Sequence, residues 1–319
     1  MINVLIVYAP GFEFTDDQVK TLKAEYPQCA FEISDNDSVT DAQLEKAEVL
    51  VGFPNPAVLK KAKHLKWLHL SSIGVDKHVD QSLYASPDVM LSNSSGTYGH
   101  PISEHIVGLM VALARNFKFF MLNQPKALWE KKMANKDMFG STVLIVGLGD
   151  VGSQVAQRLQ GFGMHIIGVK RTMGPKPAYV DELYTSADLN TLLPKADFVV
   201  LSLAATPDTV HIMSKERLAL MRKDAYLINI GRGTLIDQNA LYEALKTKQI
   251  AGAAIDVSTP EPLPEDNPLW GLDNLIITPH CSGKSPTTSL RQFAIFKEEL
   301  GRYVEGQKPK NLIDFKLKY

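Results

Sequence analysis

The sequence predicts an α/β protein that contains two doubly wound parallel sheets. Short apolar runs alternate with polar, turn-bounded stretches of helical spacing, the pattern typical of parallel strands joined by helices. Two such series occur, on either side of a long apolar segment at 102–120. With 319 residues, of which 45% are hydrophobic and 22% charged, the chain is long enough for two packed domains.

The first series occupies the first hundred residues. Its expected strands and helical stretches alternate in the order 4–8, 16–25, 30–33, 41–47, 49–53, 56–62 and 67–70. The second series begins after 138–140, and its expected strands lie at 143–146, 166–169, 198–201, 226–230, 253–256 and 275–278. Such alternation predicts one parallel sheet in each half.

Three further segments connect or complete these halves. Residues 102–120 are expected to form one long helix that bridges the two lobes, with a buried face of Ile106, Leu109, Met110 and Leu113. Residues 286–304 have the pattern of an amphipathic helix. The basic tail 308–319 carries apolar side chains for docking, so the chain is expected to cross back to the first domain.

A glycine-rich turn at 142–152 carries the strongest functional signal. An apolar strand runs directly into Gly147-x-Gly149-x-x-Gly152, with Asp150 and Val151 between the last two glycines, and a helix follows. Gly147 allows the tight turn, Gly149 lets the backbone approach a pyrophosphate, and Gly152 allows close packing of helix and strand. The helix N-terminus adds partial positive charge. This context favours a dinucleotide site over a simple turn.

Composition excludes several other classes of function. A formal net charge of −1 and the lack of a long basic run argue against nucleic acid or an anionic membrane as partner. No apolar stretch of about 18 residues and no basic leader are present, so we expect a cytoplasmic protein. Cys29 and Cys281 give neither a disulfide framework nor metal-ligand spacing, and no metal site is expected.

The strand after the glycine loop ends in Lys170 and Arg171, followed by Thr172. An acidic residue in this region normally accepts hydrogen bonds from the adenosine ribose. Lysine and arginine cannot accept them, but they pair well with a 2′-phosphate, so NADP is favoured and NAD remains possible. The alternative is that both cations are solvated at a strand end while the backbone binds the ribose.

Arg232, Glu261 and His280 follow three successive expected strands, at the edge where ligands collect in open α/β sheets. Taken singly, each has an ordinary interpretation, as a surface cation, a loop carboxylate or a buried histidine. Together they suffice for carbonyl reduction. The cation holds a carboxylate and polarises the carbonyl, the imidazolium donates a proton, and the anion favours the protonated imidazole.

At these positions the chain resembles the D-isomer-specific 2-hydroxyacid dehydrogenase family, in particular its NADP-preferring glyoxylate/hydroxypyruvate reductase-like branch. The likeness covers most of the chain. It rests on the glycine loop 147–152, on 228–233 around Arg232, on Asp256 with Glu261-Pro262, and on Pro279-His280 followed by Gly283. Segments 71–76, 93–96 and 103–105 also look like family landmarks.

The resemblance implies a role for each of these residues. His280 would be the catalytic acid/base, Glu261 its hydrogen-bonded partner, and Arg232 the residue that grips the substrate carboxylate and carbonyl oxygen. Asp256 would face the nicotinamide carboxamide, and Thr206 would lie at the adenosine side. Backbone N–H groups of Ile73, Gly74 and Val75 would bind the substrate carboxylate.

The resemblance also implies the domain organisation. A flavodoxin-like substrate-binding domain would comprise 1–98 plus 287–319, and a Rossmann dinucleotide-binding domain 99–286. The substrate, a small 2-oxo acid or D-2-hydroxy acid, would lie in a cleft between them. A homodimer is implied, formed through the cofactor-binding lobe and its long helix. A dinucleotide-sensing interaction protein of the same fold is the alternative function.

Two departures from the family pattern concern residues near the expected site. Ser258 stands where an aromatic residue is frequent, and alanine stands in 203–206 where the family often has proline. Neither removes a catalytic group. Glu104 and His105 are interpreted as structural, whereas Tyr98, His100 and the 53–55 loop are candidates for shaping the substrate pocket. Which 2-oxo acid is used, and in which direction, is left open.

Overall fold

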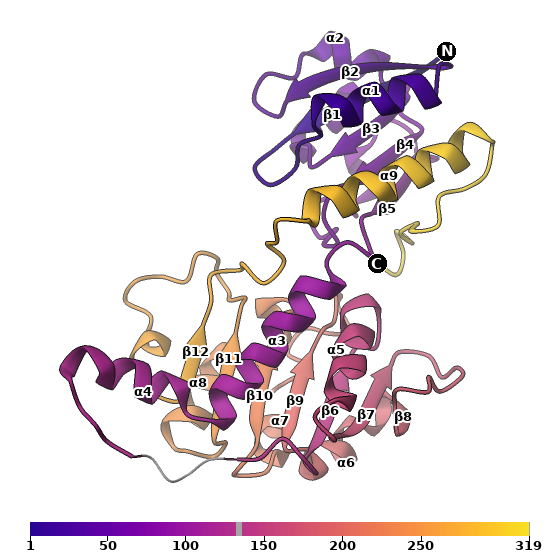
Figure 1. Cartoon of the computed structure of the whole chain (residues 1–319). Helices are drawn as coiled ribbons and strands as arrows, with labels where there is room; N and C mark the ends of the chain where they lie inside the picture. The colour runs from indigo at the N-terminus through magenta and orange to yellow at the C-terminus, as the bar shows by residue number, and fades with distance from the viewer. Residues whose placement is uncertain (132–135, 319) are drawn as a thin grey trace. The chain divides into compact units, whose positions relative to one another are not determined.

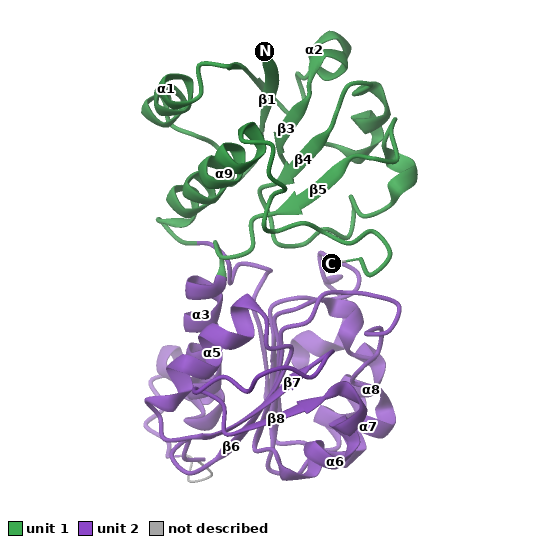
Figure 2. Cartoon of the chain, turned by 90° about the vertical axis from the view of Figure 1, so that its right-hand side faces the viewer, with its two compact units in different colours: residues 1–98, 285–319 green, residues 99–284 purple. Residues whose placement is uncertain are grey.

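The computed structural model describes residues 1–131 and 136–318. The chain divides into two compact units (Figure 2). Unit 1 comprises residues 1–98 and 285–319, and unit 2 comprises residues 99–284. Each unit contains a parallel sheet flanked by helices, which confirms the predicted α/β class with two doubly wound sheets.

Unit 1 has a five-stranded parallel sheet with the strand order β2-β1-β3-β4-β5 (Figure 1). This is the flavodoxin-like order. The strands are β1 Ile2–Tyr8, β2 Cys29–Asp35, β3 Val49–Gly52, β4 Trp67–Leu70 and β5 Met90–Asn93. The helices are α1 Asp16–Glu25, α2 Asp41–Lys46 and α9 Thr288–Val304, with 3-10 helices Pro56–Lys61 and Gln81–Leu83.

The two faces of this sheet have separate apolar cores. Helices α1 and α9 cover one face (Figure 2), where Phe296 of α9 stacks on Trp67 of β4 with a ring-centroid distance of 5.9 Å. Helix α2, the Pro56–Lys61 helix and the C-terminal tail cover the other face, where Ile313 and Phe315 pack. The expected docking of the tail is therefore confirmed for residues up to 318, and Tyr319 lies outside the described residues.

Unit 2 has a seven-stranded parallel sheet with the order β12-β11-β10-β9-β6-β7-β8, the Rossmann order with one additional strand. The strands are β6 Thr142–Val146, β7 His165–Lys170, β8 Glu182–Thr185, β9 Phe198–Leu201, β10 Tyr226–Asn229, β11 Gly252–Ile255 and β12 Leu275–Ile277. The helices are α3 Gly99–Ala114, α4 Phe117–Asn123, α5 Asp150–Gln160, α6 Leu189–Leu192, α7 Lys215–Leu220 and α8 Gln238–Lys246. Helices α3 and α5 cover one face, and α6, α7 and α8 the other (Figure 1). Short 3-10 helices occupy Gln124–Lys126, Ser186–Asp188, Leu193–Lys195, Gly233–Leu235 and Pro268–Gly271.

The expected single helix at 102–120 is wrong. The segment forms two helices, α3 and α4, because Asn116 adopts a left-handed conformation with φ 56° and interrupts the hydrogen-bond ladder. Asparagine enters this region more easily than most residues. The buried face is confirmed, since Ile106, Leu109, Met110 and Leu113 of α3 are all buried.

Two strands, β5 and β8, were not expected from the sequence, and α9 begins at Thr288 rather than at 286. Both strands lie at the edge of their sheets. The β5 strand is buried but ends in the polar residues Ser92 and Asn93, and β8 is only partly buried, so neither has a clear apolar run. Among the described residues, no single helix is long and apolar enough to cross a membrane. The pair Gly99–Ala114 and Phe117–Lys126 reaches that length together, but it is bent by 71°.

Candidate active site

The glycine loop joins β6 to α5 at the carboxyl edge of the unit 2 sheet. Gly147 has a φ of 101°, and a Cβ placed there would lie 2.7 Å from the Ser202 carbonyl oxygen. A Cβ on Gly152 would lie 1.9 Å from the Gly147 carbonyl oxygen. Both glycines are therefore required by the protein's own packing.

Gly149 differs from its two neighbours because nothing lies within 4 Å of an added Cβ. It is the N-cap of α5, and no side chain caps the first N–H groups of that helix. An uncapped helix N-terminus beneath open space suits a phosphate group. The loop thus fits the pyrophosphate of a dinucleotide, with Asp150 and Val151 in the first turn.

Lys170 is the last residue of β7, which pairs with β6, and Arg171 follows it. The basic pair therefore lies one strand away from the glycine loop, at the same edge of the sheet. Arg171 is exposed. In the loop after β9, the backbone N–H of Thr206 donates to Thr209 Oγ1 over 2.8 Å, which fixes the turn.

His280 and Glu261 form the central pair of the site. His280 Nδ1 lies 2.8 Å from Glu261 Oε2. The other carboxylate oxygen, Oε1, accepts the backbone N–H of Ser258 over 3.0 Å, so Glu261 is oriented from both sides. Ser258 Oγ donates to the Pro260 carbonyl oxygen over 2.8 Å. This hydroxyl ties the loop at the position where the family often has an aromatic side chain.

Arg232, Asp256 and His280 follow the neighbouring strands β10, β11 and β12. Because the strands are parallel, all three residues lie at the carboxyl edge of the sheet. Asn229 Nδ2 donates to the Arg232 carbonyl oxygen over 2.9 Å, and Arg232 Nη1 donates to the Gly231 carbonyl oxygen over 2.7 Å. The base of the arginine is thereby fixed.

Asp256 is 1% exposed, and both of its carboxylate oxygens accept hydrogen bonds from the protein. Oδ1 accepts from Thr278 Oγ1 over 2.5 Å and from the Cys281 N–H over 3.0 Å, while Oδ2 accepts the Ser282 N–H over 3.0 Å. Burial alone would raise the pKa of Asp256, but hydrogen bonds from Ser282, Thr278 and Cys281 outweigh burial and lower it. A nicotinamide contact for this residue stays a prediction.

The loop after β4 contains Ile73, Gly74 and Val75, and polar side chains fix its course. Ser72 Oγ donates to the Gly74 carbonyl oxygen over 2.7 Å, and Asn93 Nδ2 donates to the Ile73 carbonyl oxygen over 2.8 Å. The three residues are thus held as one rigid turn in unit 1. Their contact with a substrate stays a prediction.

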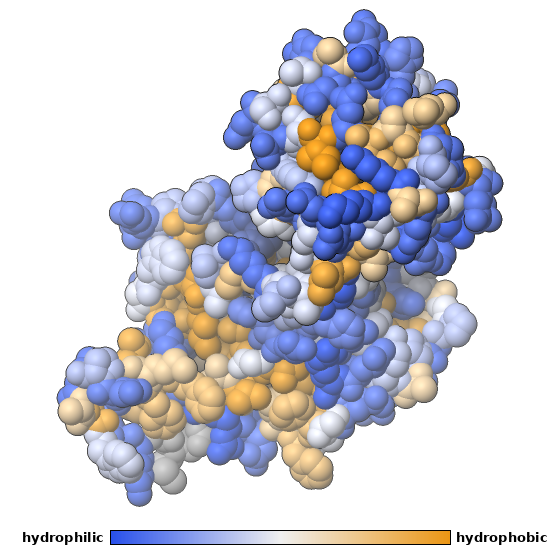
Figure 3. Space-filling model, turned by 45° about the horizontal axis from the view of Figure 1, so that its top comes forward, coloured by the Kyte–Doolittle hydropathy of each residue, from blue (hydrophilic) through white to orange (hydrophobic). Residues whose placement is uncertain are grey.

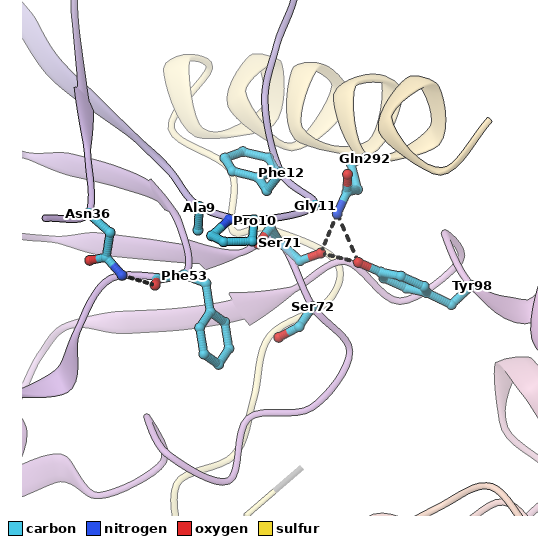
Figure 4. Close-up of a pocket in the computed structure, with 10 residues that line it drawn as sticks. All are labelled: Ala9, Pro10, Gly11, Phe12, Asn36, Phe53, Ser71, Ser72, Tyr98 and Gln292. Atoms are coloured by element: carbon cyan, nitrogen blue, oxygen red, sulfur yellow. Dashed lines mark hydrogen bonds between the residues drawn. The ribbon is translucent and has the colours of Figure 1, made fainter. Parts of the chain in front are cut away.

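Next to this turn, unit 1 contains a cavity of about 350 Å³ (Figure 4). Its lining residues follow the ends of β1, β2, β3 and β4, directly precede α3, or lie on α9; they are Ala9, Pro10, Gly11, Phe12, Asn36, Phe53, Ser71, Ser72, Tyr98 and Gln292. Tyr98 Oη donates to the Ser71 carbonyl oxygen over 2.7 Å, and Gln292 Nε2 donates to both groups over 2.8 Å.

Tyr98 and the loop with Phe53 were predicted from the sequence as pocket residues, whereas residues 9–12, Asn36 and Gln292 were not. Gln292 is 1% exposed on an otherwise amphipathic helix, and a polar residue on an apolar face is the signal that could have found it. His100 is not among the lining residues of this cavity; it belongs to unit 2, where its Nδ1 is 3.1 Å from Arg158 Nη2.

Residues 107–282 match the model of the D-isomer specific 2-hydroxyacid dehydrogenase NAD binding domain, which is more than half of the chain. The chain belongs to the D-isomer specific 2-hydroxyacid dehydrogenase family. The resemblance inferred from the sequence motifs is confirmed.

Individual relatives differ in length and in named activity. The chain is 35% identical over 258 residues to a D-3-phosphoglycerate dehydrogenase of Methanocaldococcus jannaschii, which covers 81% of this chain but 49% of that protein. This chain thus spans about half the length of that curated relative. It is 32% identical over 265 residues to a glyoxylate reductase of Korarchaeum cryptofilum, covering 81% and 78% of the two chains.

Among solved structures, a D-isomer specific 2-hydroxyacid dehydrogenase from Xanthobacter autotrophicus Py2, in complex with NADPH and MES, aligns over 100% of both chains. The sequence identity is 26% and the TM-score is 0.86. The family supports binding of NAD(P) and catalysis as an oxidoreductase, while the preferred cofactor and substrate are matters for a proposal.

Replacing Asp256 by Asn should destabilise unit 2 at neutral pH. The amide leaves a backbone N–H facing another donor, at a cost of roughly 2–3 kcal/mol in free energy of unfolding. Because the folded pKa of Asp256 is lowered, its stabilisation is complete above the unfolded pKa of about 4 and disappears as pH falls through the folded value. The measurement is urea unfolding at pH 7 and at about pH 3. The difference in free energy of unfolding between the original protein and D256N should be smaller at the lower pH.

Asp266→Asn is the matched control, since Asp266 is exposed in the same region of the chain. It should change the free energy of unfolding by less than about 0.5 kcal/mol. A D256N protein as stable as the control at pH 7 would contradict the stabilising role of the carboxylate.

Proposed function

We propose that the protein is an NADP(H)-preferring oxidoreductase that reduces small 2-oxo acids to D-2-hydroxy acids. The observation that carries this proposal is the hydrogen-bonded pair His280–Glu261, 2.8 Å long, at the same sheet edge as Arg232 and the glycine loop. When bound, NADPH would supply the hydride for the carbonyl carbon of the substrate. The residues of the chain bind the acid, polarise the carbonyl and deliver the proton.

Each catalytic residue has one task in this reaction. His280 donates a proton from Nε2 to the carbonyl oxygen, since Nδ1 is bonded to Glu261. The Glu261 carboxylate stabilises the imidazolium and fixes the ring. The Arg232 guanidinium binds the substrate carboxylate and stabilises negative charge on the carbonyl oxygen in the transition state. Backbone N–H groups of Ile73, Gly74 and Val75 complete the binding of the carboxylate.

The cofactor contacts belong to unit 2, which is the proposed dinucleotide-binding domain, and unit 1 is the proposed substrate-binding domain. Gly147, Gly149, Asp150, Val151 and Gly152 bind the pyrophosphate through the loop and the N-terminus of α5. Thr206 and Asp256 lie on the adenosine and nicotinamide sides. Lys170 and Arg171 bind the 2′-phosphate, a preference also supported by NADPH in the Xanthobacter relative.

The side chain of the 2-oxo acid has space in the unit 1 cavity of about 350 Å³. Ser72 lines this cavity and directly precedes the turn that would bind the substrate carboxylate. Phe12 and Phe53 supply apolar surface, while Asn36 and Ser72 supply polar groups. These features support substrates larger than glyoxylate, such as hydroxypyruvate or oxo acids with longer side chains.

A homodimer and a cytoplasmic location complete the proposal. The segment from α4 to residue 131 exposes six large side chains with apolar surface, which are Phe117, Phe120, Met121, Leu122, Leu128 and Trp129. Figure 3 shows orange and tan, that is hydrophobic, surface on unit 2. Trp129 is 97% exposed. Contiguous apolar surface of this kind is typical of an interface between subunits. We expect light scattering to give a mass close to twice 35.3 kDa, and a monomer at micromolar concentration would contradict the dimer.

We expect the purified protein to oxidise NADPH in the presence of 2-oxo acids and His280→Ala to lose about 10²–10⁴-fold in kcat. Glu261→Gln removes the anion that stabilises the imidazolium. Its rate of reduction should therefore fall off at a lower pH than that of the original protein. Rates measured from pH 5 to 9 with glyoxylate, hydroxypyruvate, pyruvate and phenylpyruvate test both variants.

Glu265→Gln, an exposed residue of the same loop region, is the control and should leave the pH profile unchanged. An E261Q profile identical to that control would overturn the role of Glu261. Dinucleotide binding without turnover of any 2-oxo acid would favour the dinucleotide-sensing alternative.

The double variant Lys170→Ala, Arg171→Ala should weaken NADPH far more than NADH. Each lost contact to a phosphate costs about 1–3 kcal/mol, so the KM for NADPH should rise at least tenfold while that for NADH changes less than about threefold. Lys223→Ala removes an exposed cation after α7 and serves as control. Equal losses for both cofactors would show that neither cation contacts a 2′-phosphate.

A further inference from the structure

We propose that Thr278 and His105 are positioning residues that hold the loop carrying His280 in its reactive conformation. They act through the buried Asp256 carboxylate and touch neither substrate nor cofactor. The catalytic consequence rests on the proposed function, whereas the effect on the loop does not.

The loop has a backbone conformation that needs support. His280 has a φ of 48°, in the left-handed region that residues other than glycine rarely adopt. Such a conformation persists only where the surrounding structure enforces it. Three successive N–H groups provide the support. The N–H of His280 donates to the backbone carbonyl oxygen of Asp256 over 2.8 Å, and those of Cys281 and Ser282 donate to its carboxylate over 3.0 Å each.

The Asp256 carboxylate can hold the N–H groups of Cys281 and Ser282 only if the side chain keeps one orientation. The Thr278 hydroxyl fixes that orientation by donating to Oδ1 over 2.5 Å. Thr278 is itself held, since its N–H donates to the Ile255 carbonyl oxygen over 3.0 Å. The hydroxyl thus connects the ends of β11 and β12, on either side of the bend that leads to His280.

A hydroxyl has one proton, so the direction of the next hydrogen bond is determined. Because Thr278 Oγ1 donates to Asp256, it accepts from His105 Nε2, which lies 3.1 Å away. The same nitrogen is 3.9 Å from Asp256 Oδ1. The donating nitrogen of His105 therefore points at the Thr278–Asp256 pair.

His105 connects this pair to a rigid element. It lies on α3, whose neighbouring residue Ile106 is fully buried against the unit 2 sheet. Glu104, beside it, faces another way, with Oε1 3.6 Å from Arg158 Nη2. The chain of contacts runs from α3 through His105, Thr278 and Asp256 to the backbone of 280–282. Displacing a catalytic group by about 1 Å can cost about 100-fold in rate.

Thr278→Val tests the proposal because valine keeps the shape of threonine and removes both hydrogen bonds. Amide hydrogen exchange of the full chain, followed by mass spectrometry of the peptide that contains 280–282, should be at least tenfold faster in T278V. The kcat for reduction should fall about 10-fold to 100-fold. Thr278→Ser retains the hydroxyl and should restore both exchange and kcat to within about threefold.

His105 is tested in the same way with Phe and Gln. H105F removes the donor and should lower kcat about 3-fold to 10-fold, whereas H105Q keeps an N–H donor and should lose less. Both residues act through the same series of contacts. The fold-loss in kcat of the T278V/H105F double variant should therefore be at most about twice that of T278V alone. A fold-loss in the double variant equal to the product of the two single fold-losses would show that the residues act independently and would overturn the proposal.

Two further results would overturn the proposal. One is normal protection of the Cys281 and Ser282 amides in T278V, and the other is an equal loss of kcat and of protection in T278S and T278V. Hydrogen exchange is measured without substrate, so it remains informative even if no 2-oxo acid is turned over. Faster exchange without any turnover in the unaltered protein would support the positioning role and reject only the proposed reaction.

Discussion

The candidate active site depends on the hydrogen bonds that the buried carboxylate of Asp256 accepts. A charge in the interior is costly unless it is fully hydrogen-bonded, and here Thr278, Cys281 and Ser282 satisfy it. The hydrogen bonds do more than offset burial, because they lower the pKa of the carboxyl and keep it ionised. The same contacts determine the path of the chain after β12, which places His280 where Glu261 can reach Nδ1.

The sheet of unit 2 brings distant parts of the sequence together. Parallel strands end at one edge, so the glycine loop after β6, Arg232 after β10 and His280 after β12 share that edge although more than a hundred residues separate the first from the last. Close packing at Gly152 allows α5 to begin directly above the sheet, and open space at Gly149 leaves its N-terminus accessible. Binding of a dinucleotide and orientation of the acid therefore follow from the same strand order.

The sequence predicted the class, the order of elements and most strand bounds, because apolar runs and turn residues are local signals. Prediction from the sequence failed where a single residue, or a contact between residues far apart in the chain, determines the local structure. Asn116 divides the expected long helix through its left-handed conformation, which periodicity does not detect. The edge strands β5 and β8 carry weaker apolar patterns.

At the site, motifs identified Glu261, His280 and Asp256. No pattern could show that Asp256 is bound by its own loop, that His105 meets Thr278, or that Gln292 joins Tyr98, since these contacts depend on tertiary packing.

The most direct test of the proposed reaction is the fate of a labelled hydride. The protein would be incubated with 4-deuterated NADPH of each stereochemistry and with hydroxypyruvate or phenylpyruvate, and the product would be analysed by chiral chromatography and mass spectrometry. We expect the D-2-hydroxy acid with one deuterium on C2 from one of the two labelled cofactors. An L-product, or a product without deuterium at C2 from either cofactor, would contradict hydride transfer by a D-specific 2-hydroxyacid dehydrogenase.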